Sequence, residues 1–120
     1  MDWEKYNQVP LEYATASAIG LASATLGAME RRGFVESIAT KPKQYRRVVT
    51  PQVLVYKYID ENRDDFGEFF VLQRPYGKCN GRMLCSLDSA GDVVDCWGQK
   101  YDLSDVIRIE FRTKGYDLNA

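Results

Sequence analysis

A run of small residues constrains the fold of this chain more than any other feature. Twelve of the fifteen residues from Ala14 to Ala28 are Ala, Ser, Thr or Gly. Such residues bury little apolar area each, so helices built from them gain stability by close approach to their neighbours. Helix-compatible residues continue to Arg31 and Arg32, and the pattern changes at Gly33. The sequence therefore predicts closely packed helix up to Arg32.

Two interpretations of this segment are open. In the first, Gly20 divides it into two helices, Leu11–Ile19 and about Ala22–Arg32, as a helix-turn-helix requires. In the second, it is one helix with an apolar stripe that recurs every three or four residues. The members of that stripe are Leu11, Thr15, Ala18, Ala22, Leu26 and Met29. We favour the divided form, because Gly lowers helix propensity by about 1 kcal/mol and Ser23 is a plausible N-cap.

Short elements are predicted on both sides of this segment. Before it, Trp3 and Tyr6 lie three residues apart in a polar stretch, which is enough for one or two helical turns that pack aromatic rings on the body. Pro10 then suits the first position of the next helix. After it, Phe34–Ile38 leads into a turn at Thr40–Lys43, and Tyr45 to Val49 lead out. We expect a short basic hairpin there.

Charge is concentrated around this hairpin. The formal net charge of the 120 residues is -1. Residues 1–50 carry seven Lys or Arg against five Asp or Glu, a balance of +2, and residues 51–120 carry nine against twelve, a balance of -3. Between Glu30 and Arg47, six cations face two anions. A local excess of +4 is typical of a nucleic-acid contact surface, although a solvated edge has the same composition.

Two motifs carry a family resemblance. Met29-Glu30-Arg31-Arg32-Gly33-Phe34-Val35 is followed about ten residues later by Tyr45-Arg46-Arg47-Val48-Val49-Thr50-Pro51. Together they resemble the end of the recognition helix and the wing of bacterial winged helix-turn-helix transcriptional regulators. The resemblance covers about forty residues, roughly 11–50, and the sequence departs from it in its meagre first helix. It implies a winged-helix fold for this region and binding to double-stranded DNA.

The resemblance also implies which residues contact DNA. Early residues of a recognition helix lie nearest the bases, whereas cations at the helix end and on the wing meet phosphates or an adjacent minor groove. The expected DNA-contacting residues are Ser23, Ala24, Thr25, Arg31, Arg32, Lys41, Lys43, Tyr45, Arg46 and Arg47. Because Ser, Thr and Ala discriminate poorly between bases, we expect weak sequence specificity.

The second half of the chain predicts a β-rich domain. Val53–Ile59 is compatible with a strand or a short helix, and four strands are then expected at residues 67–74, 82–88, 92–101 and 106–112. Asn80-Gly81 marks a hairpin turn, and residues 102–105 a single helical turn. Four or five short strands in this order resemble a small barrel of the SH3 or Sm type. The predicted fold is therefore α+β, with a winged-helix domain at 1–50 and a small antiparallel sheet or SH3-like barrel at 51–120.

The residue inventory limits the chemistry. The chain has no histidine, which excludes Cys/His zinc sites and Ser/His or Cys/His catalysis. Its three cysteines match no zinc spacing; Cys85 and Cys96 are in phase with buried strand positions, whereas Cys79 lies in a polar turn. We expect no enzymatic activity, no metal and no cofactor. With no apolar run of about 18 residues and no cationic start, we expect a cytoplasmic protein without a membrane segment.

The leading functional hypothesis is a small DNA-binding protein, a transcriptional or mobile-element regulator. Its β-rich half would form a homodimer or bind a protein partner, because a single copy with so few base-reading side chains would bind weakly. The alternative is a protein-binding module or inhibitor, of the kind found in phages and plasmids, that uses the winged-helix fold without DNA contact. The acidic net charge and the poor base-reading face are compatible with that alternative.

Overall fold

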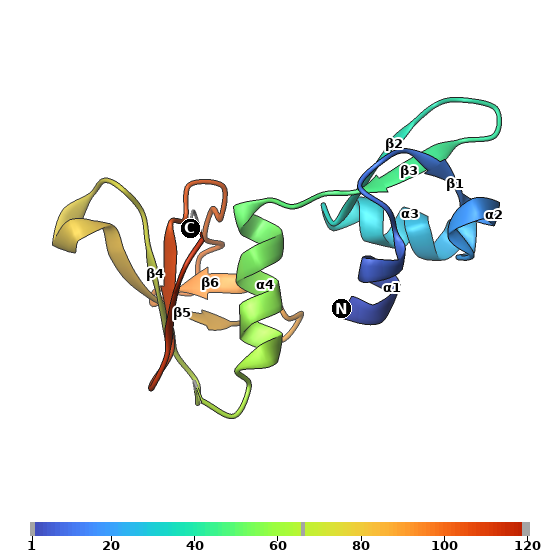
Figure 1. The fold of residues 1–120 in the computed structure, drawn as a ribbon. Helices are drawn as coiled ribbons and strands as arrows, with labels where there is room; N and C mark the ends of the chain where they lie inside the picture. The colour runs from blue at the N-terminus through green and yellow to red at the C-terminus, as the bar shows by residue number, and fades with distance from the viewer. Residues whose placement is uncertain (1, 66, 119–120) are drawn as a thin grey trace. The chain divides into compact units, whose positions relative to one another are not determined.

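The computed structural model describes residues 2–65 and 67–118, and it divides the chain into two compact units, residues 1–53 and 54–120 (Figure 1). Both units contain antiparallel sheet and helix, so the expected α+β class is confirmed. Within the described residues no helix has the length and apolar character needed to cross a bilayer.

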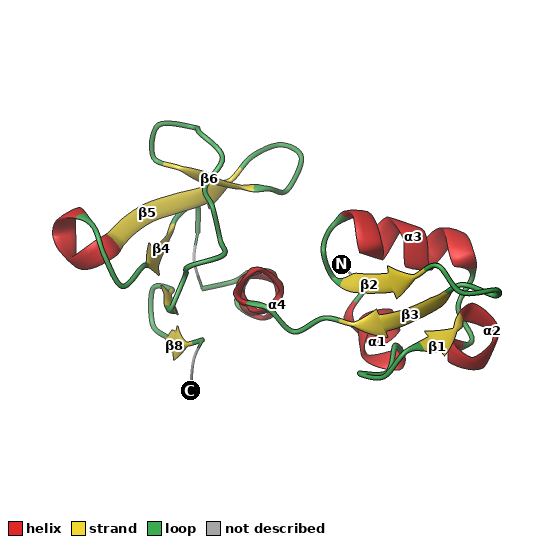
Figure 2. Ribbon diagram, turned by 90° about the horizontal axis from the view of Figure 1, so that it is seen from above, coloured by secondary structure: helices red, strands yellow, loops and turns green. Residues whose placement is uncertain are grey.

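Helices and strands alternate in the first unit. In chain order they are α1 (Trp3–Gln8), β1 (Ala14–Thr15), α2 (Ala16–Ile19), α3 (Ser23–Arg31), β2 (Val35–Ile38) and β3 (Gln44–Arg47). The three strands form an antiparallel sheet in the order β1-β3-β2. Val35 pairs with Arg47 and Ile38 with Gln44, so β2 and β3 are a hairpin, and α3 lies beside it (Figure 2).

The divided form of the helical segment is confirmed. Gly20 ends α2 with a left-handed backbone, φ 84°, a conformation that Gly adopts without strain. The expected start of the first helix at Leu11 is wrong, because Thr15 is the N-cap of α2 and its Oγ1 accepts a hydrogen bond from the Ala18 amide at 3.2 Å. Pro10 lies outside any helix. Ser23 does not cap α3 either: Ala22 occupies that position without a side-chain bond.

Aromatic side chains of α1 close the core of the first unit, as the spacing of Trp3 and Tyr6 predicts. Trp3 meets the rings of Tyr6 and Phe34 edge-on, with centroids 5.3 and 5.6 Å apart. Such pairs add about 0.5–1.5 kcal/mol each beyond area burial. Leu26 and Met29 of α3 are buried in the same unit. Because the helices have so few large side chains, these aromatic contacts supply bulk that the small-residue run lacks.

The second unit is a five-stranded antiparallel sheet covered on one face by a helix. The division between the units falls within α4 (Pro51–Glu61), which is followed by β4 (Phe70–Gln73), the 3-10 turn η1 (Lys78–Gly81), β5 (Arg82–Leu87), β6 (Val93–Asp95), β7 (Arg108–Glu110) and β8 (Gly115–Asp117). The strand order is β6-β5-β4-β7-β8. Val55 and Ile59 of α4 pack on Phe70, Leu72 and Ile109 of the sheet.

Several expectations for this half need correction. The sheet is open, since no ladder in the described residues joins β6 to β8, so the barrel alternative is wrong. Residues 53–59 are helical rather than extended, and β8 was not anticipated. Residues 78–81 form the η1 turn in place of a simple hairpin connection, and residues 104–105 form a turn rather than a helix.

The cysteines divide differently from the expectation. Cys85 is buried and Cys79 exposed, as predicted, but Cys96 is exposed. The prediction for Cys96 is wrong because β6 ends at Asp95, so strand alternation does not continue to the next residue. Burial raises the pKa of the Cys85 thiol to about 12, which keeps it protonated and unreactive.

Candidate nucleic-acid interface

The exposed face of α3 carries small side chains. Ser23 and Ala24 are exposed at its first turn and Thr25 is half-buried, whereas Leu26 and Met29 point into the core. This division follows from the helical period, which places positions three apart on one face. The structure therefore leaves the three expected base-facing residues accessible on one turn of helix.

A shallow groove runs along this face. It has a volume of about 470 Å³ and lies between α1 and α3. Its wall on the side of α3 is mostly apolar, and charged residues at α1 and at the end of α3 form its rim. The residues that line it are Asp2, Lys5, Ala24, Thr25, Ala28, Met29 and Arg32. The groove exists because Ala and Thr leave space that longer side chains would fill.

The turn of the β2–β3 hairpin extends the candidate surface. Lys41 and Lys43 are exposed there, on either side of Pro42, whose peptide bond to Lys41 is cis. The Thr40 hydroxyl donates a hydrogen bond to the Pro42 carbonyl at 2.7 Å. In residues 2–65 Lys41 makes no ion pair, so its charge is available to an anionic ligand.

Glu30 joins the hairpin to α3. Its carboxylate accepts a hydrogen bond from the Ser37 hydroxyl on β2 and pairs with Lys43 Nζ at 3.4 Å. These contacts, the Ser37 hydrogen bond first, lower the pKa of Glu30 and keep it charged. Lys43 also lies over the Tyr45 ring, 5.5 Å from its centroid. The hairpin and α3 are thus held as one surface, but part of the charge of Lys43 is neutralised.

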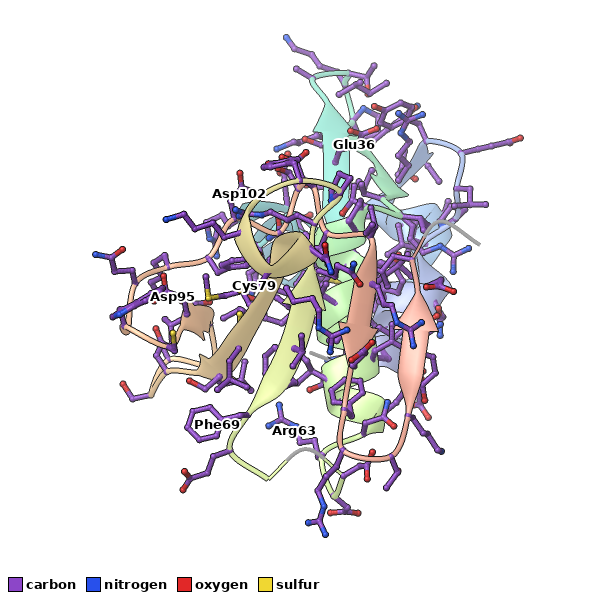
Figure 3. All side chains as sticks on the ribbon, turned by 90° about the vertical axis from the view of Figure 1, so that its left-hand side faces the viewer. Glu36, Arg63, Phe69, Cys79, Asp95 and Asp102 are labelled. Carbon is purple, nitrogen blue, oxygen red and sulfur yellow. The ribbon has the colours of Figure 1, made fainter. Side chains whose placement is uncertain are left out.

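Arg46 is partly neutralised in the same way. Its guanidinium forms an ion pair with Glu36 on β2, which Figure 3 labels, and stacks 4.7 Å from the centroid of the Tyr13 ring. The Tyr13 hydroxyl donates to the same Glu36 carboxylate at 3.5 Å. Both partners of the ion pair remain well exposed. Arg46 therefore reaches solvent but has a local anion as its first partner.

Two of the ten expected contact residues are less accessible than the others. Tyr45 is only 5% exposed, because strand alternation turns it to the core face opposite to Arg46. Arg47 is half-buried against α1: its Nη1 donates to Asn7 Oδ1 at 3.2 Å and its Cζ lies 5.6 Å from the centroid of the Tyr6 ring. Both residues help to hold the unit together: Tyr45 is buried, and Arg47 is only partly exposed.

The structure brings the remaining eight residues to two neighbouring elements. Ser23, Ala24 and Thr25 lie at the start of α3, and Arg31 and Arg32 at its end, where Arg32 lies 5.6 Å over the Phe34 ring. The other three, Lys41, Lys43 and Arg46, belong to the hairpin.

Sequence reasoning missed the contribution of other residues to this surface. Glu30 and Glu36 were counted as charges but not as partners of hairpin cations. Their positions opposite Lys43 and Arg46 depend on the strand register and on the packing of α3, neither of which a local pattern contains. Asp2, the N-cap of α1, and Lys5 within α1 also line the groove, although neither was expected at the DNA-contacting surface.

Comparisons with known proteins found no matching family model, no matching curated protein and no matching solved structure. The interface must therefore be judged on its own geometry.

Proposed function

We propose that residues 1–53 form a winged helix that binds double-stranded DNA with weak sequence preference, as a small regulator of transcription or of a mobile element. Support comes from the order of elements, helix-strand-helix-helix-strand-strand, and from the sheet order β1-β3-β2. In this arrangement α3 is the second helix of a helix-turn-helix and the β2–β3 hairpin is the wing.

The observation that carries the proposal is the link between α3 and the wing through Glu30. The Lys43 ion pair at 3.4 Å and the Ser37 hydrogen bond hold the hairpin beside the helix. Exposed cations of both elements would then face the same duplex. A helix of about 10–12 Å diameter fits the major groove while a neighbouring hairpin follows the phosphates.

The strength of this contact can be bounded. Arg31, Arg32 and Lys41 are exposed cations, while Lys43 and Arg46 would exchange Glu30 and Glu36 for phosphates. That exchange costs little, because surface ion pairs contribute about 0.2–1 kcal/mol. Three to five phosphate contacts imply a log-log salt slope of about -3 to -4.5. Dissociation constants of roughly 10⁻⁴ to 10⁻⁶ M follow for random duplex.

The test is a titration of fluorescently labelled random duplex with the full chain at several salt concentrations. We expect binding that weakens steeply with salt. The Lys41→Ala/Lys43→Ala variant should lower the affinity and reduce the magnitude of the slope by about 1 to 2.

A matched control uses Lys78→Ala/Lys114→Ala, which removes the same charge from exposed positions of the second unit. This variant should bind like the parent chain. Absence of salt-sensitive binding by the parent chain, or equal losses in both double variants, would exclude the wing as a DNA contact.

The groove on α3 favours a second candidate function, binding of a protein segment. Its apolar lining from Ala24, Ala28 and Met29 suits an aliphatic side chain better than a base edge. In this alternative the winged helix is a protein-binding module or inhibitor. If the titration shows no DNA binding, this candidate takes precedence.

A further inference from the structure

Tyr13, Arg46 and Glu36 form a row across the exposed face of the first unit's sheet. The strand register pairs Glu36 of β2, labelled in Figure 3, with Arg46 of β3. Tyr13 directly precedes β1, and the centroid of its ring lies 4.7 Å from the Arg46 guanidinium. The row faces away from Tyr45, which is buried, because successive strand residues point to opposite faces. A guanidinium is therefore held between an aromatic ring and a carboxylate on a surface that solvent reaches.

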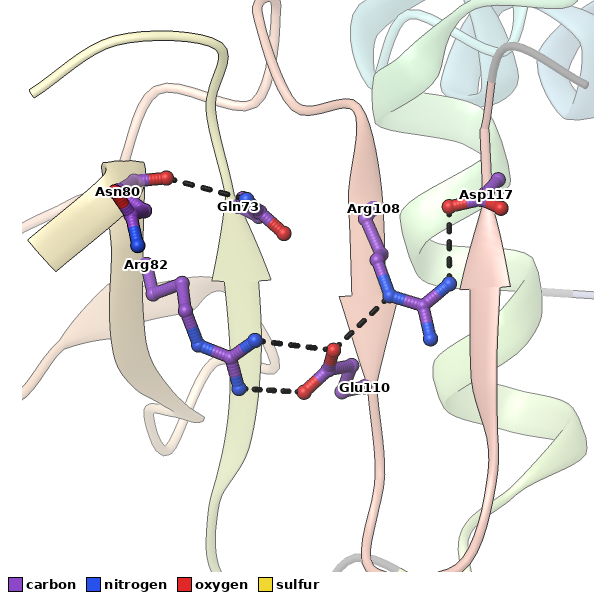
Figure 4. A network of polar contacts seen from close by, with 6 residues as sticks. All are labelled: Gln73, Asn80, Arg82, Arg108, Glu110 and Asp117. Carbon is purple, nitrogen blue, oxygen red and sulfur yellow. Dashed lines mark hydrogen bonds and ion pairs between the residues drawn. The ribbon is translucent and has the colours of Figure 1, made fainter.

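The ion pair between Arg46 and Glu36 converges on one carboxylate oxygen. Arg46 Nε donates to Glu36 Oε1, Arg46 Nη2 contacts the same oxygen, and the Tyr13 hydroxyl donates to it at 3.5 Å. A contrasting pair lies in the second unit, where Nη1 and Nη2 of Arg82 donate to the two oxygens of Glu110 at 3.1 and 2.6 Å (Figure 4). Two parallel bonds of that kind make Arg pairs with carboxylate or phosphate strong. A phosphate that offers two oxygens is therefore a better partner for Arg46 than Glu36 is.

The hairpin does not depend on Glu36. Four residue pairs fix β2 on β3 through the backbone, and the link between the hairpin and α3 runs through Glu30. The side chains of Arg46 and Glu36 are 44% and 43% exposed, and ion pairs so exposed contribute little to stability. The Glu36 carboxylate can therefore leave the guanidinium without disturbing the wing, while the Tyr13 ring still holds the guanidinium in place.

Arg46 and Lys43 project from opposite faces of the hairpin. Lys43 lies on the side of α3, where it pairs with Glu30 at 3.4 Å and lies 5.5 Å from the centroid of the Tyr45 ring. Arg46 points to the other side, opposite to Tyr45. A groove of duplex DNA has a row of phosphates along each edge. A hairpin laid in such a groove would offer Lys43 to one row and Arg46 to the other, so that one duplex engages both cations.

From this geometry we propose that Glu36 is an intramolecular competitor of DNA: its carboxylate occupies the position at Arg46 that a phosphate of the duplex takes in the complex. The inference rests on the proposed DNA binding and adds that the free chain restrains its own affinity. Binding then requires the carboxylate to leave Arg46 before the phosphate pairs with it. Because the competing pair is exposed, the restraint is modest, about two- to fivefold in affinity.

The first experiment titrates labelled random duplex with the full chain and with Glu36→Gln, which keeps the shape of the side chain but removes its charge. We expect Glu36→Gln to bind about two- to fivefold more tightly at low salt, with a log-log salt slope steeper by up to about 1. Glu110→Gln is the matched control, because it removes the same charge from a glutamate that pairs with an arginine, Arg82, in the second unit. This control should bind like the parent chain.

The second experiment separates the release of Arg46 from a general loss of repulsion between Glu36 and DNA. An arginine-specific dicarbonyl reagent is applied with and without duplex, and mass spectrometry of peptides gives the rate of modification at Arg46. Without duplex, Arg46 should react faster in Glu36→Gln than in the parent chain. Saturating duplex should protect Arg46 in both chains. Arg63 of the second unit, whose side chain is 59% exposed, is the internal reference and should react at one rate throughout.

The outcomes distinguish this inference from the proposed function. If the parent chain binds duplex but Glu36→Gln gains no affinity, or gains no more than Glu110→Gln, DNA binding stands and the competition is wrong. The competition is also wrong if duplex leaves Arg46 unprotected in both chains, because Arg46 then meets no phosphate. If neither the parent chain nor Glu36→Gln binds duplex in a salt-sensitive way, the proposed function and this inference are both overturned.

Discussion

Two glycines of the small-residue run should respond in opposite ways to substitution by alanine. Gly20 has φ 84°, and a Cβ built on it would lie 3.0 Å from Gln8 Nε2, which bonds the Ile19 carbonyl at 2.8 Å. Gly27 lies within α3 at ordinary helical angles, and its Cβ would meet Arg31 at 3.7 Å. We expect Gly20→Ala to destabilise the first unit by about 1 kcal/mol or more, and Gly27→Ala to stabilise it by up to about 1 kcal/mol.

The measurement is urea unfolding followed by Trp3 fluorescence in a Trp97→Phe background. The chain has two tryptophans, so this background leaves a single reporter in the first unit. Trp3 packs on Tyr6 and Phe34, so its emission depends on an intact core. Equal stability of the two variants would mean that the left-handed conformation at Gly20 is not required.

The three thiols also differ in their exposure, and chemical modification can measure that difference. Cys79 and Cys96 are exposed, while Cys85 is buried and its pKa is raised to about 12 by that burial. At neutral pH we expect a disulfide reagent to modify two thiols per folded chain quickly and the third only on unfolding. Mass spectrometry of the modified chain counts them. Three thiols modified at one rate would contradict the burial of β5 against α4.

Among the elements, α3 decides between the two candidate functions. Ala28 lines the groove on its exposed face, so Ala28→Lys fills the groove and adds a cation. If α3 faces DNA, this variant should bind random duplex about two- to fivefold more tightly at low salt, with a slope steeper by about 1. Ala28→Gln is the uncharged control of similar length. If Ala28→Lys leaves the affinity for duplex unchanged, α3 does not contact DNA.

The elements also show where local sequence signals suffice. The break at Gly20 and the hairpin after Gly33 were predictable, because both glycines adopt positive φ and the strands alternate around a polar turn. The burial of Tyr45 was also predictable from the sequence, because successive side chains of a strand point to opposite faces and Arg46 faces solvent. Residues 53–59 were ambiguous because a short apolar run satisfies both helical and strand periods. β8 has one large side chain in three residues, so its pairing with β7 depends on tertiary context.

The candidate interface could be predicted only in part from the sequence, and the physical reason differs from that for the helices and strands. Which cations are present is a matter of composition, but which of them are free depends on the anions that the fold places beside them. Glu30 and Glu36 precede their partners Lys43 and Arg46 by at least ten residues, and only the packing of α3 and the hairpin register bring these pairs together. A count of charges therefore overestimates the positive potential of this surface.

At the scale of the whole molecule, the DNA-binding proposal and the homodimer expected from sequence make a joint prediction about salt. If each copy neutralises three to five phosphates, a dimer that seats both copies on one duplex doubles the log-log slope to about -6 to -9. A duplex of about 10 bp accepts one copy, whereas one of about 25 bp accepts two copies a helical turn apart. Chain diluted until sedimentation finds only monomer should show the single-copy slope on both duplexes, and dimeric chain should show the doubled slope on the longer one only. A parent chain with equal slopes on both duplexes, yet dimeric by sedimentation, would mean that dimerisation does not present two DNA-binding surfaces to one duplex, which would favour the protein-binding alternative for the first unit.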